Sequence, residues 1–259
     1  MLESLYKEYR NKIYRLAISI VHNDKDAEEV IQNTFIKIME KMKGFRHESN
    51  ISTWIYKIAY NEALMYLRKK SRQLRVYNNI GKDAKRIPGW VFVNWAKLPD
   101  KQLLDKELKE RLERCFSDMP IKYRMPLLLH QIEGIPLKKS AEILHIKEGS
   151  LKTRIHRALL IVRSVLFEYF KDKEEAKELG QEKSCNSWTG FLYSFTKGEL
   201  DPKTRSAFEK HISGCSNCKK FIDGYARAIA VTEALECKDI PHELKEKMDI
   251  FVKKGGGVW

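Results

Sequence analysis

The sequence predicts an all-helical protein, and three observations lead to that prediction. Glycine and proline are scarce, with 13 and 7 among 259 residues, so long segments run without a helix breaker. Aliphatic side chains recur at spacings of three and four residues, which places them on one face of a helix. No segment alternates polar and apolar residues as a half-buried strand would. The length suits one large domain or two to three small ones.

Residues 1–71 contain three apolar stripes, which predict a small helical bundle, here called the first bundle. The first stripe lies within residues 13–20. The second lies within residues 30–42, and Asn23 and Asp24 before it are good helix caps. The third begins near Ser52 and runs to about residue 67.

The rest of the chain divides by composition into five segments. Residues 72–102 lose the periodicity, are basic and hold two glycines and two prolines, so they predict a linker. Trp90, Phe92 and Trp95 within it suggest that part of it docks on a partner. Residues 103–170 are helical again and form the second bundle. A charged linker, 171–183, then precedes the terminal module, 184–236, and a glycine-containing tail, 237–259, whose end we expect to be disordered.

The charge and the cysteine content narrow the function classes. The formal net charge is +14 and the pI is about 9.4, which favours a polyanionic partner such as nucleic acid or an anionic membrane surface. A merely soluble, highly charged surface is the alternative. The N-terminus has no apolar signal segment and no run of about eighteen apolar residues occurs, so we expect a cytoplasmic protein without a membrane contact. Five unevenly spaced cysteines favour metal ligands over a disulfide framework.

Residues 137–163 read LKKSAEILHIKEGSLKTRIHRALLIVR and predict a helix-turn-helix. A short helix ends at Leu144, Gly149 makes the turn, and Ser150 caps the second helix. The apolar side of the second helix points toward the first, and its other side carries groups suited to phosphates and base edges. A solvated basic helix without a role is the alternative. The candidate DNA-binding residues are Ser150, Lys152, Thr153, Arg154, His156 and Arg157.

The second bundle resembles region 4 of the extracytoplasmic-function (ECF) sigma factors, a group of the sigma-70 family of bacterial transcription initiation factors. The similarity rests on MPIKYR, residues 119–124, and GSLKTRIHRA, residues 149–158. It implies that the second helix reads the minus-thirty-five promoter element. Residues 139–140 and His145 depart from the family pattern on the supporting helix and the turn, and the reading face is intact.

The first bundle resembles sigma region 2 in order and spacing. DAEEVIQ, residues 26–32, matches the segment that docks on the clamp helices of the RNA polymerase β′ subunit. The resemblance therefore implies core RNA polymerase, including its β subunit, as a partner. An ordinary solvated helix face is the alternative for these positions. The candidate polymerase contacts are Asp26, Glu29, Gln32 and Asn33.

STWIYKIAYNEALMYLR, residues 52–68, matches the sigma element that melts and reads the minus-ten promoter element. Capturing unstacked bases favours aromatic faces beside cations, and the segment supplies both. A tryptophan at helical spacing, such as Trp54, is more often a core residue than a stacking platform. Met65 departs from the family pattern, so a promoter preference does not carry over. The candidate residues for minus-ten recognition and melting are Trp54, Tyr56, Tyr60, Asn61, Arg68 and Lys69.

The terminal module contains four metal-ligand residues with 25, 3 and 2 residues between them. They are Cys185, His211, Cys215 and Cys218. A Cys3His set is a normal tetrahedral site for one zinc ion. Asp201 before Pro202 predicts the start of a helix that carries the histidine near its end. Three unrelated buried cysteines are the alternative; Cys115 is expected in a core and Cys237 outside the set.

Residues 185–221 resemble the zinc-binding anti-sigma domain through GEL and H-x3-C-x2-C. In stand-alone anti-sigma factors this domain binds the sigma factor and blocks polymerase binding. Here the domain follows the sigma-like segments on one chain. We hypothesise that it acts in cis on regions 2 and 4 until metal loss, oxidation or a ligand releases it. A purely structural zinc, or a domain that recruits another protein, is the rival hypothesis.

Two other function classes compete with the sigma factor interpretation. A promoter-binding regulator could use the helix-turn-helix without engaging core polymerase. A zinc hydrolase or nuclease is disfavoured, because four protein ligands leave no water position on the metal and no acid-base constellation is present. The chain is therefore expected not to be an enzyme and to have no catalytic residues.

Overall fold

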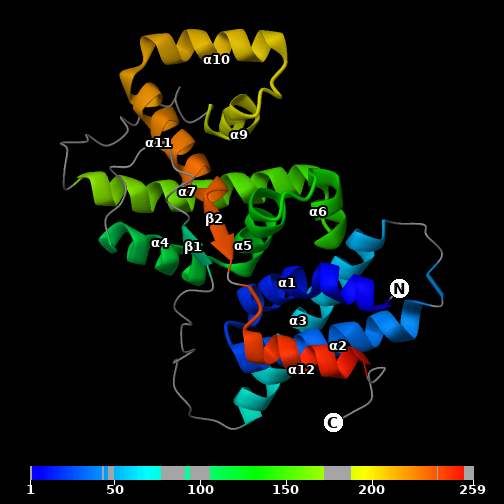
Figure 1. Ribbon diagram of the computed structural model, residues 1–259. Helices are drawn as coiled ribbons and strands as arrows, with labels where there is room; N and C mark the ends of the chain where they lie inside the picture. Colours follow the sequence, from blue (N-terminus) through cyan, green and yellow to red (C-terminus); the bar gives the residue numbers. More distant parts are fainter. Residues whose placement is uncertain are drawn as a thin grey trace.

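The computed structural model describes residues 2–42, 44–45, 50–76, 91–93, 106–171, 188–237 and 239–253. Within these ranges most residues are helical, and the only strands are two of three residues each. The predicted all-α fold is confirmed. Figure 1 shows three tiers, with α1, α2, α3 and α12 at one end, α4 to α7 in the middle, and α9 to α11 at the other end.

The first bundle consists of α1 (Leu2–Val21), α2 (Asp24–Met42) and α3 (Ile51–Val76), each packed against the other two. The apolar stripes seen in the sequence meet in its interior. Side chains at most 1% exposed there include Ile13, Leu16, Ala17, Ile31, Phe35, Ile38, Ile55 and Ala59. Burial of these stripes is what stabilises the three helices as a unit.

The predicted cap at the start of α2 is confirmed. The side-chain oxygen of Asn23 accepts hydrogen bonds from the backbone N–H groups of Lys25 (2.9 Å) and Asp26 (3.2 Å). His22, the residue before the cap, has a φ of 53° and turns the chain between α1 and α2. Two of the orphan donors at the helix start are thereby satisfied.

Polar contacts also join α2 to α3. Asp26, 9% exposed, accepts a hydrogen bond from the Tyr66 hydroxyl (2.7 Å) and forms an ion pair with Lys70. Burial and the neighbouring carboxylate raise the pKa of Tyr66 above its ordinary value. A second ion pair joins Lys37 of α2 to Glu62 of α3. Asp26, predicted to contact polymerase, is thus engaged inside the bundle in this arrangement.

The second bundle consists of α4 (Lys106–Asp118), α5 (Ile121–Leu127), the π-helical turn η3 (Leu128–Ile132), α6 (Leu137–Ile143) and α7 (Glu148–Lys171). Helix α7 packs against α4, α5 and α6 and is the centre of this tier. Its buried side meets theirs in a core that includes Leu108, Leu112, Phe116, Leu129, Ile143, Leu151, Ile155 and Leu159.

Two details of the predicted helix-turn-helix were wrong. The N–H of Leu151 donates to the carbonyl of Lys147 (3.0 Å), so the helical ladder of α7 starts earlier than predicted and Ser150 lies within its first turn. The left-handed residue of the turn is His145, with a φ of 54°, whereas Gly149 is helical. The turn is therefore made at a histidine, a residue that adopts a positive φ less readily than glycine does.

The terminal module contains the 3-10 turn η4 (Thr189–Phe191), α9 (Leu192–Thr196), α10 (Pro202–Gly214) and α11 (Ser216–Glu233). Helix α11 packs along α7, and α9 also contacts α7. The module therefore lies directly on the second bundle, as Figure 1 shows.

Beyond α11 the chain returns to the first bundle. Strand β2 (Leu235–Cys237) pairs antiparallel with strand β1 (Val91–Val93), and α12 (His242–Lys253) packs on α1. From the sequence, β1 was expected in the linker, the first two residues of β2 in the terminal module, and Cys237 and α12 in the tail, and neither the strands nor this helix was predicted. The last residues of the tail and most of the linker lie outside the described residues.

Arg124 ties α5 to the end of α4. Its side chain is 4% exposed, and one guanidinium nitrogen donates to the carbonyls of Ser117 (2.8 Å) and Phe116 (3.3 Å). These carbonyls belong to the last turn of α4, where intrahelical partners are lacking. Burial lowers the pKa of Arg124 to about 10, against the opposite effect of Asp118.

Replacing Arg124 with methionine is expected to lower the free energy of unfolding of the second bundle by about 2 kcal/mol, because two buried carbonyls lose their donor. Chemical denaturation followed by circular dichroism measures the change. Lys109→Met, at an exposed position of α4, is the matched control and should be nearly neutral. Equal effects of the two variants would contradict the assignment.

Candidate nucleic-acid interface and metal centre

Helix α7 separates its two faces as the sequence predicted. Leu151, Ile155 and Leu159 are fully buried on the side that meets the second bundle. The candidate DNA-binding residues lie on the remaining surface, but not all are equally accessible. Ser150, Thr153 and Arg157 are exposed, whereas Lys152, Arg154 and His156 are half-buried.

The terminal module engages two of the half-buried candidates. Nζ of Lys152 lies 2.6 Å from a carboxylate oxygen of Glu199, and Nδ1 of His156 is hydrogen-bonded to the hydroxyl of Tyr225 at 2.9 Å. The Tyr225 side chain is fully buried, so this contact is shielded from water. Burial, and then the charge of Arg157, lower the pKa of His156. Two of the candidate DNA-binding side chains, Lys152 and His156, are thus bonded within the protein.

The crossing of α11 over α7 is close. The Arg163 guanidinium lies 3.6 Å from the centre of the Phe221 ring, a cation-π contact, and its Nε donates to the Phe221 carbonyl (3.3 Å). Gly224 lies at the same place, and a Cβ atom there would approach Arg163 Nε to 3.2 Å. A larger side chain at this glycine would displace the Arg163 side chain that contacts Phe221.

The aromatic candidates of α3 are largely covered. Trp54 is half-buried and its ring lies 4.9 Å from that of Phe45. Tyr56 is 4% exposed and its hydroxyl donates to Glu133 (3.4 Å), so burial and this carboxylate raise its pKa. Tyr60 is half-buried, and burial raises its pKa too. In this arrangement Tyr56 is not presented to a nucleic acid.

The polar candidates of α3 are accessible. Asn61, Arg68 and Lys69 are exposed, and the first two line an open hollow of about 360 Å³ between α2 and α3. Lys37 and Lys41 of α2 line the same hollow. The structure therefore brings Asn61 and Arg68 together beside two further cations.

The candidate polymerase contacts of α2 differ in accessibility. Glu29 is exposed, with Lys69 at 3.8 Å, and Asn33 is half-buried. The side-chain amide of Gln32 donates to Glu28 (3.4 Å). Together with the internal position of Asp26, this leaves Glu29 as the most accessible of the four candidates.

Helix α12 is attached to the first bundle beside this face. Asp249 pairs with Arg10 of α1 (3.3 Å), and the Tyr6 hydroxyl donates to the carbonyl of Lys245 (3.3 Å). Lys247 lies 3.8 Å from Glu28 of α2. The apolar side of α12 is buried against the bundle, with Leu244, Met248, Phe251 and Val252 at most 7% exposed.

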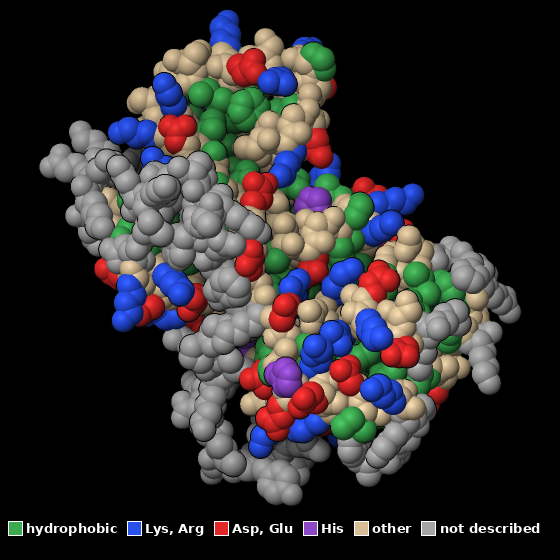
Figure 2. All heavy atoms as spheres, viewed as in Figure 1, with side chains coloured by type: hydrophobic (Ala, Val, Ile, Leu, Met, Phe, Trp, Pro, Cys, Tyr) green, Lys and Arg blue, Asp and Glu red, His purple; other side chains and the backbone are tan. Residues whose placement is uncertain are grey.

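Figure 2 shows how charges are distributed over one face of the molecule. Lysine and arginine side chains alternate with acidic ones over the first bundle, and hydrophobic side chains gather on the terminal module beside α10. On this face, within the described residues, the basic groups do not form a continuous band.

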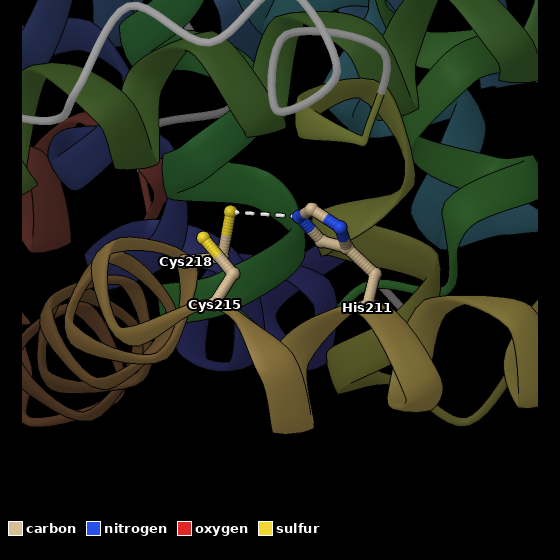
Figure 3. A group of neighbouring side chains, drawn as sticks. All are labelled: His211, Cys215 and Cys218. Carbon is tan, nitrogen blue, oxygen red and sulfur yellow. Dashed lines mark hydrogen bonds between the residues drawn. The ribbon is translucent and has the colours of Figure 1, made fainter.

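The metal-ligand candidates of the terminal module come together where α10 ends and α11 begins. The carboxylate of Asp201 accepts the N–H of Thr204 (3.0 Å) with Pro202 at the first helical position, which confirms the predicted start of α10. His211 lies near the other end of that helix. Figure 3 shows its ring pointing toward two cysteine side chains, and they are Cys215 and Cys218.

The three donor atoms fit a zinc ion. They lie within 4.8 Å of one another, with His211 Nε2 3.1 Å from Cys218 Sγ. Tetrahedral zinc, with bonds of about 2.0–2.3 Å, holds its ligand atoms about 3.5 Å apart. Among the described residues, no other group of three such side chains meets this criterion. The fourth candidate ligand, Cys185, lies outside the described residues.

Comparison with known proteins identifies the family to which the chain belongs. Residues 5–73 match the family described as "Sigma-70 region 2", residues 109–161 "Sigma-70, region 4", and residues 185–219 "Putative zinc-finger". The ECF RNA polymerase sigma factor SigW of Bacillus subtilis is 30% identical over 159 residues, which is 61% of this chain and 84% of SigW. The chain belongs to the ECF sigma factors.

Other relatives of this ECF sigma factor agree. The RNA polymerase sigma-H factor of Pseudomonas aeruginosa is 28% identical over 60% of this chain and 80% of its own length. The ECF RNA polymerase sigma-E factor of Haemophilus influenzae is 29% identical over 60% and 81%. A solved structure of the sigma factor RpoE with the anti-sigma factor NepR from Bartonella quintana shares the fold, with a TM-score of 0.50 and 20% identity over 63% of this chain and 95% of that one.

The family assignment settles one question that the sequence left open. A regulator that never engages polymerase would need only a helix-turn-helix, whereas this ECF sigma factor also carries region 2. Sigma factors bind core RNA polymerase and promoter DNA.

None of the described helices has the length and the apolar run that are needed to cross a membrane.

Replacing Cys218 with serine is expected to reduce bound zinc from about one ion per chain to near zero, because a structural site loses most of its affinity with one thiolate. Metal analysis of the purified full-length chain measures this. Cys115→Ala is the control, since that thiol lies in α4 and burial raises its pKa to about 12. Full zinc retention in the Cys218 variant would contradict the site.

Proposed function

We propose that this ECF sigma factor is held by its own C-terminal residues in a closed arrangement that recognises promoters poorly. The observation that carries the proposal is the engagement of Lys152 and His156 by Glu199 and Tyr225. A donor that is bonded inside the protein is not available to a base edge. Opening would expose the reading face of α7.

The open sigma factor would use the candidate residues as follows. Contacts to the minus-thirty-five element would come from Ser150, Lys152, Thr153, Arg154, His156 and Arg157. Contacts to the minus-ten element would come from Trp54, Tyr56, Tyr60, Asn61, Arg68 and Lys69. The β′ clamp helices of core polymerase would meet Asp26, Glu29, Gln32 and Asn33. Tyr56 and Asp26 are buried in the closed arrangement, so their use requires local rearrangement.

Helix α12 would close the first bundle in the same way as α11 closes α7. It buries an apolar face on α1 and places Lys247 beside Glu28 on α2, one residue from the exposed Glu29. These contacts support competition between α12 and a polymerase helix for this part of the first bundle. Regions 2 and 4 would then be covered by the same C-terminal stretch of chain.

The metal site would stabilise the closed arrangement through α11. We assign one zinc ion to His211, Cys215 and Cys218, with Cys185 as the fourth ligand, and the bound ion would crosslink the ends of α10 and α11. Cys218 and Tyr225 are seven residues apart on α11, which places them on the same side of the helix. Removing the metal, or oxidising the thiolates, would therefore loosen the helix that contacts His156.

Gly224→Leu tests the closed arrangement without altering any residue of sigma regions 2 and 4. The larger side chain would displace Arg163 and weaken the contact of α11 with α7, while leucine favours the helix itself. We expect run-off transcription by the full-length variant with core polymerase, on promoters selected from a genomic library, to rise about tenfold over the unmodified chain.

Ala226→Leu is the matched control for this experiment. It places the same side chain on the exposed side of α11, two residues away, and should leave transcription unchanged. Equal transcription by the Gly224 variant and the unmodified chain, with both bound to core polymerase to the same extent, would overturn the proposal.

The closed arrangement is expected to weaken as the pH falls below 6.5. Because burial and Arg157 lower the pKa of His156, the closed form favours the neutral ring. Below the ordinary value of 6.5, an uncovered His156 takes up a proton that the covered one does not, so closure loses free energy down to the lowered pKa. Above 6.5 both forms are neutral, and Tyr225, whose pKa is raised by burial, stays protonated.

Energy transfer between labels at two exposed positions, Ser206 of α10 and Lys109 of α4, measures this opening. Transfer should fall with acid in the unmodified chain. It should be less sensitive to pH in His156→Gln, which keeps a hydrogen-bonding group but does not titrate. The same pH dependence in both chains would show that another group is responsible.

A further inference from the structure

A short segment, of which residues 235–237 and 239–240 are described, leads from the terminal module toward α12 and lies between the two bundles (Figure 1). It is anchored by apolar side chains, since Leu235, Cys237 and Ile240 are 3%, 5% and 7% exposed. A chain segment of this length in a simple connection would normally lie on the surface. Its burial indicates that it holds neighbouring elements together.

The first element that it holds is strand β1. The register pairs Val91 with Cys237 and Val93 with Leu235 in an antiparallel ladder. Strand β1 belongs to the stretch between the first and second bundles, and it also packs on α4. The C-terminal part of the chain is therefore hydrogen-bonded to the connection between regions 2 and 4.

The second contact is an ionic joint centred on Arg15 of α1. Its guanidinium lies 2.7 Å from the carboxylate of Asp239, in the segment, and 3.3 Å from that of Glu133, at the end of η3. The same Glu133 carboxylate accepts the hydrogen bond from the Tyr56 hydroxyl (3.4 Å). The first bundle, the second bundle and the segment thus meet at one cation.

The two halves of this joint differ in strength. The Glu133 side chain is only 6% exposed, so leaving its charge without a cation would be costly. Asp239 is 63% exposed, and its pair with Arg15 is of the kind that contributes little on its own. Asp239 therefore attaches the segment to an ion pair that Glu133 and Arg15 already form. The pairing of β2 with β1 provides the second attachment of the segment.

We propose that residues 235–240 act as a strap that fixes the two bundles and their connection in one arrangement, through β2 on β1 and Asp239 on the Arg15–Glu133 pair. The strap is distinct from the contact of α11 with α7, because its strand partner is β1 and its ion pair is formed with Arg15 of α1. It keeps Tyr56, a candidate for minus-ten contact, covered at the joint. Any effect of the strap on transcription rests on the proposed function, whereas the attachment of the strap to the two bundles does not.

The register provides a direct test with a native cysteine. Directly opposed residues in an antiparallel pair have Cα atoms about 4.5–5.5 Å apart, within the range of a disulfide. Val91→Cys in the full-length chain should therefore form a disulfide with Cys237 when oxidised glutathione is added with excess zinc. Two thiols lose two protons and two electrons, and one glutathione disulfide is reduced. Peptide mass spectrometry identifies the link, and its absence would overturn the strap.

The functional effect is measured in the Gly224→Leu background, where the contact of the terminal module with α7 is weakened. The oxidised Val91→Cys chain should transcribe about tenfold less than the same chain after reduction. Val93→Cys, whose register partner is Leu235, is the control and should respond to neither treatment. A disulfide that forms without any effect on transcription would show that the strap does not regulate.

A second measurement is independent of transcription and of the proposed function. Burial raises the pKa of Cys237 to about 12, so its alkylation by iodoacetamide reports opening of the strap. Asp239→Asn should raise this alkylation rate about threefold. Asp223→Asn, at an exposed position of α11, should leave it unchanged. Equal rates in the two variants would overturn the part assigned to the ionic joint.

Discussion

The closed arrangement depends on the crossing of α11 over α7. An arginine over a phenyl ring, a glycine beside that arginine and a buried tyrosine lie at this crossing. Helix α7 is at once the central core helix of region 4 and the helix that we propose reads the promoter. A module that packs against α7 for stability would therefore cover the candidate reading face by the same contact.

Most of the helices and three candidate metal ligands were predictable from the sequence for a simple reason. Burial of one helix face leaves a repeat of three and four residues, and this repeat was visible in all three helices of the first bundle. His211, Cys215 and Cys218 were found by spacing, since ligands close in sequence at a helix junction are also close in space. Both signals come from residues that are close in sequence, so they can be recognised without knowledge of the fold.

What the sequence did not show is which surfaces meet. Tyr56 and Asp26 are typical of residues that contact a partner, yet both are buried by contacts with other parts of the same chain. Strands β1 and β2 are too short to show an alternating pattern and lie more than 140 positions apart. The apolar spacing of α12 is present in the sequence, from Leu244 to Val252, but the three glycines that follow it favour a disordered tail instead.

The covalent link between regulator and sigma factor has a quantitative consequence. Because the terminal module and region 4 share one chain, the module meets α7 at an effective concentration of about millimolar, set by the connection rather than by expression. Contacts that would be too weak between separate proteins can then keep most chains closed. The ratio of regulator to target is also fixed at one in every cell. In the proposed regulation, opening would therefore be a unimolecular event, and the fraction of open chains would report the signal rather than the copy number of either part.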